Sequence, residues 1–182
     1  MSENKAASRY AKSIIDLSEE NNVLEDVKGD MVLISGVIKS NPELEAILKN
    51  PIVPVIKKSR ILADLFKSKV HVISSSFMDL MVNKGRAAIL FSATKQVVTQ
   101  YNDLKGIVTA EVTSAVALTA ENRTEITAIV KKEIGANEVV IKEKVNADLI
   151  GGFILKVGDK QFDASIASGL KKLKKEFAQG VA

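Results

Sequence analysis

The sequence contains no cysteine and no tryptophan, a single histidine, and aromatic residues at only 4% of its 182 positions. The lack of cysteine excludes disulfides, thiolate metal sites and cysteine nucleophiles. One histidine, His71, cannot by itself supply a zinc site of the usual kind. A Ser-His-Asp triad would have to use the same residue, and no pattern in the sequence supports one. We therefore predict a protein that is not an enzyme and that holds neither a metal nor a cofactor.

Glycine is also too sparsely placed for a phosphate-binding loop. A Walker-type loop needs Gly, four residues and then Gly-Lys-Ser/Thr, and the chain has no such run. Gly151-Gly152 and Gly158 instead predict a tight entry into a strand and a hairpin turn, since glycine adopts backbone conformations closed to other residues. His71, near a predicted helix start, is interpreted as a surface or capping residue.

Charge of one sign is not concentrated in either half. The net charge is +4, and the chain up to Lys105 carries 15 basic and 12 acidic residues against 11 and 10 in the remainder. The one dense basic cluster, Lys171-Lys172 and Lys174-Lys175, interleaves with Leu170, Leu173 and Phe177 on an amphipathic helix. This helix face is either solvated or in contact with an acidic partner or an anionic membrane surface. A basic RNA- or ribosome-associated binding module therefore stays an alternative, although the few aromatics leave little for bases to stack on.

Long hydrophobic runs are missing as well. No apolar stretch approaches the roughly 20 residues of a membrane-spanning helix, and the polar N-terminus leads directly into a helical pattern without a signal-like segment. We expect a cytosolic or peripheral protein.

Up to about Lys105, apolar residues recur every three or four positions, which indicates helices. Asn41-Pro42 is typical of a helix start, because Asn caps helices and Pro is tolerated at their first position. The two prolines in 50–54 must interrupt the helical pattern. Six helices with short connections are typical of a bundle. Their apolar stripes are Ala7, Tyr10, Ile14 and Leu17; Val23, Val27, Met31, Ile34 and Ile38; Leu44, Ile47 and Leu48; Ile61, Leu62, Leu65 and Phe66; Ile73, Phe77, Leu80 and Met81; and Leu90, Val97, Tyr101 and Leu104.

After Lys105-Gly106 the spacing of apolar residues changes to two, which indicates strands. Strands are expected at 107–116, 138–145, 153–157 and 161–163, with a helix capped by Thr119 after the first and another at the end. The fold class is therefore α+β: an N-terminal six-helix bundle (1–105) followed by a small mixed α/β domain (106–182) ending in a helix. The residues expected on the inward side are Val108, Ala110, Val112 and Val116; Ile126, Ile129 and Val130; and Val139, Ile141 and Val145. In the last helix, Ile166, Leu170, Leu173 and Phe177 recur at steps of four, three and four.

Several of the predicted helices are apolar around more than the single stripe that a bundle needs. Ile14, Ile15 and Leu17 widen the first helix, and 77–82 widens the fifth. The surplus indicates either central burial or a groove that accepts a partner helix through anchors at helical spacing.

Five short motifs resemble the delta subunit family of F-type ATP synthases, which is related to the mitochondrial oligomycin-sensitivity-conferring protein. They occur in the family's order over nearly the whole chain, although Lys84 separates the Asn and Gly that the family usually has adjacent. The motifs are Arg9-Tyr10-Ala11-Lys12 near the N-terminus; Asn50-Pro51 followed by Lys57-Lys58; Asn83-Lys84-Gly85-Arg86; Ala110-Glu111-Val112-Thr113; and Gly151-Gly152-Phe153 with Gly158-Asp159 and Asp163-Ala164-Ser165.

The resemblance implies a non-catalytic stator connector, present in one copy per complex, that keeps the catalytic head from turning with the rotor during proton-driven ATP synthesis. It implies a peripheral location on the cytoplasmic side of a bacterial membrane, or on the stromal side of a thylakoid membrane. The first domain would bind N-terminal helices of the alpha subunits between its first and fifth helices, through Tyr10, Ala11, Ile14, Phe77, Leu80 and Met81. The second would bind the C-terminal ends of the stalk made by the b subunits, through Ile150, Gly151, Gly152, Phe153, Leu170, Leu173 and Phe177.

Overall fold

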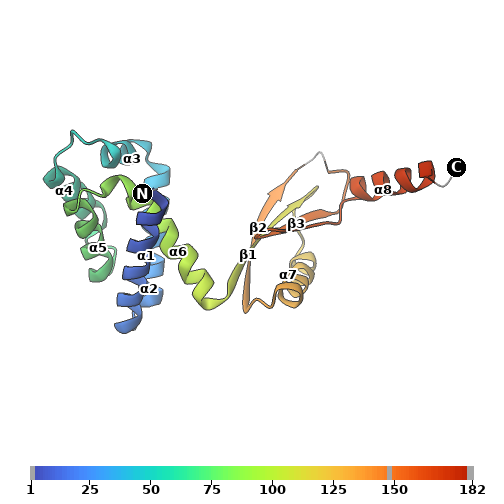
Figure 1. The fold of residues 1–182 in the computed structure, drawn as a ribbon, viewed down its shortest axis with the longest axis horizontal. Coiled ribbons are helices and arrows are strands. Elements are labelled where there is room, and N and C mark those ends of the chain that lie inside the picture. Colours follow the sequence, from blue (N-terminus) through green and yellow to red (C-terminus); the bar gives the residue numbers. More distant parts are fainter. Residues whose placement is uncertain (1–2, 147–148, 180–182) are drawn as a thin grey trace. The chain divides into compact units, whose positions relative to one another are not determined.

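The computed structural model describes residues 3–146 and 149–179 of the chain. Within helices, it leaves undescribed the side chains of Glu133, Ile134, Lys172, Leu173, Lys175, Glu176, Ala178 and Gln179. The chain divides into two compact units, residues 1–102 and 103–182 (Figure 1). The first is all helical and the second contains a four-stranded sheet, so the predicted fold class is confirmed.

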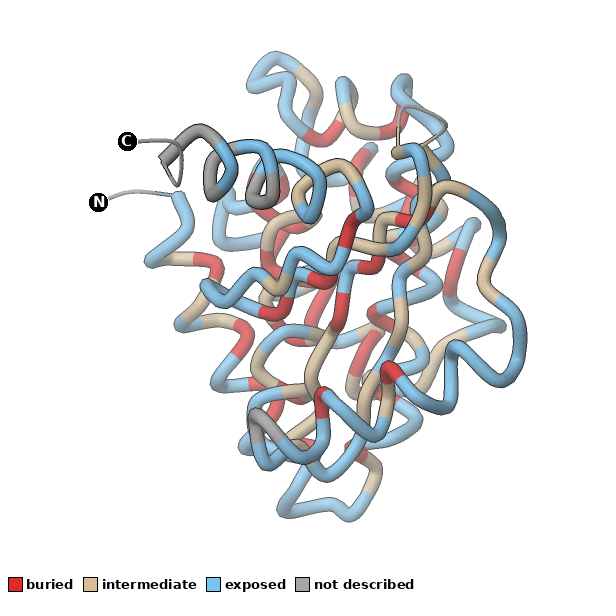
Figure 2. Tube along the Cα trace, turned by 90° about the vertical axis from the view of Figure 1, so that its right-hand side faces the viewer, coloured by how far each residue is buried: buried red, intermediate tan, exposed pale blue. Residues whose placement is uncertain are grey.

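The first unit consists of six α-helices and one 3₁₀ turn, as the apolar stripes predicted. The elements are α1 (Glu3–Glu20), α2 (Leu24–Ser40), α3 (Pro42–Lys49), α4 (Val55–Phe66), α5 (Val72–Asn83), η1 (Ala87–Ile89) and α6 (Leu90–Lys105). Buried residues recur along the helices at intervals of three or four positions, seen in red in Figure 2. Phe66 is the largest side chain shielded almost completely from solvent, and most of the other such side chains are aliphatic or methionine, among them Met31, Ile34, Leu62 and Met81.

Local sequence signals fix where these helices begin and end. The His71 side chain caps α5 by accepting the Ile73 N–H at its Nδ1, as the capping interpretation predicted. Gly85 ends the same helix in a left-handed conformation (φ 67°), and the Arg86 N–H reaches back to the Met81 carbonyl oxygen. Together with the bond from the Gly85 N–H to the Val82 carbonyl oxygen, this bond forms a Schellman motif, in which glycine avoids the penalty that a Cβ would incur.

Asn41 differs from the prediction. Pro42 does occupy the first turn of α3, but the Asn41 side chain makes no capping bond to that helix. Its Nδ2 instead donates to the Val37 carbonyl oxygen at 2.8 Å, and so it satisfies an acceptor at the end of α2. An Asn between two helices can serve either one, and here the preceding helix receives the bond.

The second unit is a four-stranded mixed sheet with one helix packed against it. Its elements are β1 (Ile107–Ser114), α7 (Ala120–Ile134), β2 (Glu138–Val145), β3 (Phe153–Val157), β4 (Lys160–Asp163) and α8 (Ile166–Gln179). The strand order is β2-β1-β3-β4; β1 and β2 are parallel and the other two pairings are antiparallel. A parallel pair needs a crossover, which α7 supplies between β1 and β2.

One face of the sheet forms the core of this unit. Ala110 and Val112 of β1 pack with Leu155 and Val157 of β3 and with α7. The prediction of an inward position is wrong for three residues. Val116 is 74% exposed because β1 ends at Ser114. Val145 is 56% exposed at the end of β2, and Ile129 is 43% exposed on α7. Strand ends and the outer side of a covering helix lie beyond the packed area, which periodicity alone cannot reveal.

The start of α8 is fastened to the start of β3. The Ile166 N–H donates to the Gly151 carbonyl oxygen at 3.0 Å, and the Ala164 N–H donates to the Phe153 carbonyl oxygen at 3.0 Å. Gly152 has φ 77°, and a Cβ added there would lie 2.2 Å from the Ala164 carbonyl oxygen. The two glycines therefore permit a close backbone contact, consistent with the tight strand entry that their sequence predicted.

We expect Gly152→Ala to lower the free energy of unfolding of the second unit by about 2 kcal/mol or more, because both the left-handed backbone and the close contact are lost. Gly36→Ala is the matched control: Gly36 lies inside α2, with no atom within 4 Å of an added Cβ. It should stabilise the first unit by about 0.5–1 kcal/mol. Urea unfolding of the full chain, followed by circular dichroism, measures both. A Gly152→Ala chain as stable as the wild type would contradict the backbone contact.

Candidate protein-binding grooves

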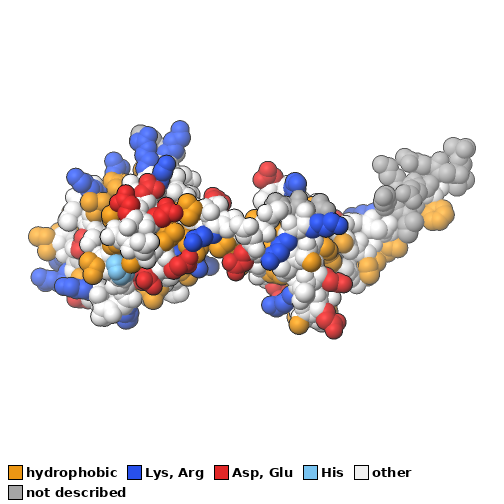
Figure 3. Space-filling view, turned by 90° about the horizontal axis from the view of Figure 1, so that it is seen from below, with side chains coloured by type: hydrophobic (Ala, Val, Ile, Leu, Met, Phe, Trp, Pro, Cys, Tyr) orange, Lys and Arg blue, Asp and Glu red, His pale blue; other side chains and the backbone are white. Residues whose placement is uncertain are grey.

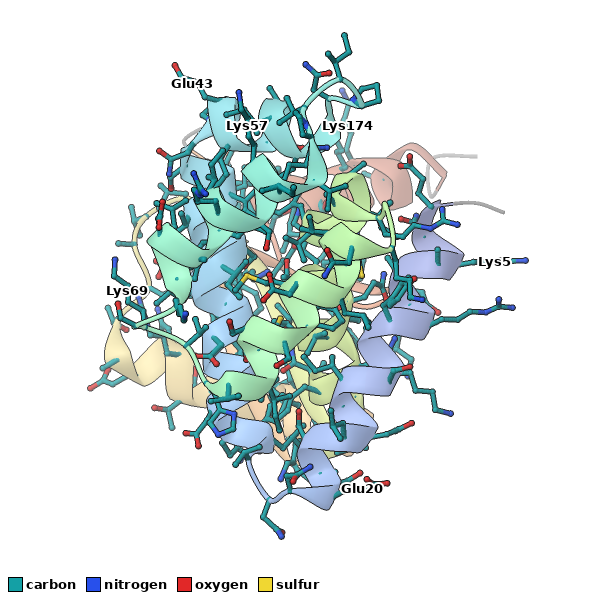
Figure 4. All side chains as sticks on the ribbon, turned by 90° about the vertical axis from the view of Figure 1, so that its left-hand side faces the viewer. Lys5, Glu20, Glu43, Lys57, Lys69 and Lys174 are labelled. Atoms are coloured by element: carbon teal, nitrogen blue, oxygen red, sulfur yellow. The ribbon has the colours of Figure 1, made fainter. Side chains whose placement is uncertain are left out.

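An apolar groove lies between α1 and α5 in the first unit. Its volume is about 190 Å³, and the residues that line it come from about one turn of α1 and two turns of α5: Ser13, Ile14 and Leu17 of α1, and Ile73, Ser76, Phe77 and Leu80 of α5. Figure 4 looks onto α5 (green), with α1 beside it from Lys5 at its upper end to Glu20 at its lower end. Leu17 and Leu80 are 47% and 46% exposed, so large apolar side chains at the groove still face water.

The wall formed by α5 is held in register by a carboxylate from α2. Asp30 Oδ2 accepts the His71 N–H at 2.8 Å and the Ser74 hydroxyl at 2.6 Å. Backbone N–H groups at a helix start have no partner within the helix, and a carboxylate there is favoured by the helix dipole. Ser74 is fully buried, which fixes the rotation of α5 about its axis. This rotation turns Ile73, Phe77 and Leu80 toward α1.

The residues expected at this site fall into three groups. Ile14, Phe77 and Leu80 line the groove. Ala11 and Met81 are completely buried, so they support the two helices from inside rather than offering contact surface. Tyr10 lines a neighbouring hollow instead.

Sequence reasoning missed two large groove residues, Leu17 and Ile73. Both were assigned to the apolar stripes of their helices. Their spacing held the missing signal, since Leu17 lies three residues after Ile14 and Ile73 lies four before Phe77, and such positions share a helix face.

The neighbouring hollow continues along α1 toward its N-terminal end. It has a volume of about 260 Å³ and is lined by Ala6, Arg9, Tyr10 and Ser13 of α1 and by Arg86, which follows α5. Ser13 belongs to both depressions, so the two meet along α1.

Some of the residues expected to meet the stalk are exposed, and others hold the second unit together. Ile150, Leu170 and Phe177 are 72%, 54% and 74% exposed. Phe153 packs against the core of the second unit, and Gly151 and Gly152 make the backbone contact at the start of α8. The Leu173 side chain lies outside the described residues. The apolar side of α8 therefore presents at least Leu170 and Phe177 to solvent.

Asp163 organises the first turn of α8. Its carboxylate accepts the Ser165 N–H at 2.9 Å through Oδ1 and the Ser168 hydroxyl at 2.6 Å through Oδ2. The Ser168 N–H donates in turn to Ser165 Oγ at 3.3 Å, which is an N-cap bond. Hydrogen bonds from Ser168 and then Ser165 lower the pKa of Asp163, because they favour its charged form. The Asp-Ala-Ser motif is thus a connection between β4 and α8.

Neither a metal-holding cluster nor a membrane-spanning helix occurs in the part of the chain that the structure describes. Among residues 3–146 and 149–179, no set of three or more His, Asp or Glu side chains is arranged to hold a metal ion. Over the same ranges, no helix combines the length and apolar character needed to cross a membrane.

Comparison with known sequences gives a family for nearly the whole chain. The family model described as ATP synthase delta (OSCP) subunit matches residues 6–177. The chain is 40% identical over 181 residues to ATP synthase subunit delta of Cytophaga hutchinsonii, covering 100% of this chain and 98% of that protein. It is 32% identical over 173 residues to the chloroplastic subunit delta of Ochrosphaera neapolitana, covering 95% and 97% of the two chains.

Comparison with solved structures supports the fold. A chain in the cryo-EM structure of the Toxoplasma gondii mitochondrial ATP synthase hexamer aligns with a TM-score of 0.68 at 19% identity. The alignment covers 94% of this chain and 97% of that one. At this level of identity the likeness establishes a shared fold.

The Asp163 connection predicts a pH dependence. Because hydrogen bonding holds the folded pKa of Asp163 below its unfolded value, its contribution to stability is fully present above the unfolded pKa. The contribution is lost as pH falls through the folded pKa. We expect hydrogen-exchange protection of the Ser168 amide to fall at acid pH in the wild type, toward the level in Asp163→Asn. Equal protection in the two proteins at neutral pH would contradict this assignment.

Proposed function

Because the chain belongs to the ATP synthase delta (OSCP) subunit family, we propose that it is a non-catalytic connector in the stator of the F-type ATP synthase. The first unit binds N-terminal helices of the alpha subunits in the α1/α5 groove. The second binds the C-terminal ends of the stalk made by the b subunits. One copy per complex holds the catalytic head against rotation, peripherally on the cytoplasmic side of a bacterial membrane or the stromal side of a thylakoid membrane.

The observation that carries this proposal is the apolar groove between α1 and α5. Its α5 wall runs from Ile73 to Leu80, a rise of about 10 Å, which matches two turns of a bound helix. An amphipathic helix presents apolar side chains at positions i, i+3, i+4 and i+7, and these can interleave with the two walls. Covering the exposed halves of Leu17 and Leu80 contributes about 1 kcal/mol for each side chain.

The second contact is supported by the exposed apolar side of α8. Leu170 and Phe177 lie seven residues apart, two turns along one face, and both are more than half exposed. A helical stalk end can pack against such a stripe as one more helix of a small bundle. The lysines of the same helix suit an acidic rim on the partner.

A connector needs these two properties and no chemistry. A rotor under torque loads the link between head and stalk, so each contact must release slowly, which a few well-buried anchors provide. Two contacts on one molecule also raise the effective concentration of each partner for the other inside the complex.

The RNA-binding alternative gains no support from the face of each unit that Figure 3 shows. On the face drawn in Figure 3, basic and acidic side chains are interspersed over each unit, whereas a nucleic-acid site gathers positive charge in one patch. The family membership also favours the synthase role.

The groove contact is tested by Leu80→Asp. The substitution places a charge where an apolar anchor must bury, and we expect at least tenfold weaker binding, about 1.4 kcal/mol or more. The probe is a synthetic peptide of the first 20 or so residues of the alpha subunit from the same genome, titrated by calorimetry.

Leu33→Asp is the matched control for this experiment. Leu33 is 39% exposed on α2 and does not line the groove, so its change should leave the affinity within twofold of the wild type. Thermal unfolding followed by circular dichroism checks that both variants fold. Equal binding by folded Leu80→Asp and Leu33→Asp proteins would refute the groove assignment.

The stalk contact is tested by Phe177→Ser in the full chain, with a peptide from the C-terminal end of the b polypeptide as the probe. Phe177 and Val116 are each 74% exposed, and Val116 lies in the loop after β1, so Val116→Ser is the matched control. We expect at least tenfold weaker binding for Phe177→Ser only, because an aromatic anchor is lost. Similar affinities of the two variants would contradict a role for α8.

A further inference from the structure

The basic hollow beside the α1/α5 groove has no role in the apolar contact described above. Arg9 and Arg86 line it with Ala6, Tyr10 and Ser13. Two of the five residues that line it are arginines. Since arginine stays charged at all ordinary pH values, Arg86 brings a positive charge to the end of the groove wall.

The position of Arg86 is set by the backbone and not by its side chain. The Arg86 N–H bonds to the Met81 carbonyl oxygen at 2.8 Å, and the Gly85 N–H bonds to the Val82 carbonyl oxygen at 3.0 Å. Gly85 has a left-handed backbone conformation, which ends α5 and turns the chain directly into η1. The turn therefore places an arginine at the end of the groove wall, where the helix itself could not extend.

The two depressions form one surface along α1. The hollow takes residues 6–13 of α1 and the groove takes residues 13–17, so their centres are about five residues, or roughly 8 Å, apart along the helix. A helix lying in the groove would reach the hollow about one turn beyond its apolar anchors.

We propose that this hollow binds an acidic side chain of the helix that occupies the groove, about one turn beyond its last apolar anchor, and so sets the direction and register of that helix. The partner is thus an amphipathic helix with an acidic residue at one end of its apolar stripe. This inference rests on the proposed binding of the alpha N-terminal helix and specifies the chemistry of that ligand. Charge complementarity is the reason: an apolar groove accepts a helix in several registers, whereas a guanidinium pairs with a carboxylate through a fixed fork of donors.

The test is a double-mutant cycle between Arg86→Gln in the full-length protein and a Glu→Gln or Asp→Asn change in the alpha N-terminal peptide, at the acidic position one turn from its apolar stripe. We expect Arg86→Gln to weaken binding of the unmodified peptide three- to tenfold at low ionic strength. The loss should shrink in 0.5 M salt, which screens exposed charges. It should also largely disappear with the amide peptide, because the pair is then already broken.

Lys12→Gln is the matched control, since Lys12 is an exposed cation on α1 that lines neither depression. It removes the same charge and should change the affinity less than twofold. Equal effects of Arg86→Gln and Lys12→Gln, or an equal loss with the acidic and amide peptides, would overturn the inference. In that case, loss of binding by Leu80→Asp in the same series would still support the groove contact. A wild-type protein that binds neither peptide would overturn both.

Discussion

The carboxylate of Asp30 holds α5, the helix on which the proposed binding surface depends. It reaches from α2 to the His71 N–H and the Ser74 hydroxyl, and so it fixes both the start of α5 and its rotation. Every large groove residue of α5 is placed by that rotation. A shift of one residue along the helix would turn these side chains by about 100°, which would close the groove and expose core. The polar contact between α2 and α5 therefore decides which side chains of α5 line the groove beside α1.

The two units expose apolar side chains in different ways. In the first, the exposed leucines of the groove rest on a wide core, and small residues such as Ala11 let α1 lie close to its neighbours. In the second, the core lies between one sheet face and α7, and α8 is joined through its first turn. A groove suits a partner that inserts between two walls. An amphipathic helix with an open face suits a partner that completes its packing.

Much of the fold could be predicted because the sequence signals were local. The change of apolar spacing after Gly106 marks the passage from helices to strands, and Thr119 caps α7 as its position suggested. Asn41 was assigned to the wrong helix end, since its side chain can satisfy either neighbour. Val116 and Ile129 were placed inward by periodicity, but periodicity states which residues share a face and not how far the covering layer extends.

The sequence by itself determined the kinds of element and their order, because capping residues, glycine positions and apolar spacing act over a few neighbouring residues. Its short motifs also carried the resemblance to the family. It also supplied most of the apolar groove residues as members of helix stripes. Only the tertiary structure decided that Ala11 and Met81 lie inside while Leu17 and Ile73 line the groove. The reason is physical: which side of a stripe meets the core and which meets solvent depends on the rotation of one helix against another, and contacts such as that of Asp30 set this rotation across about 40 residues of sequence.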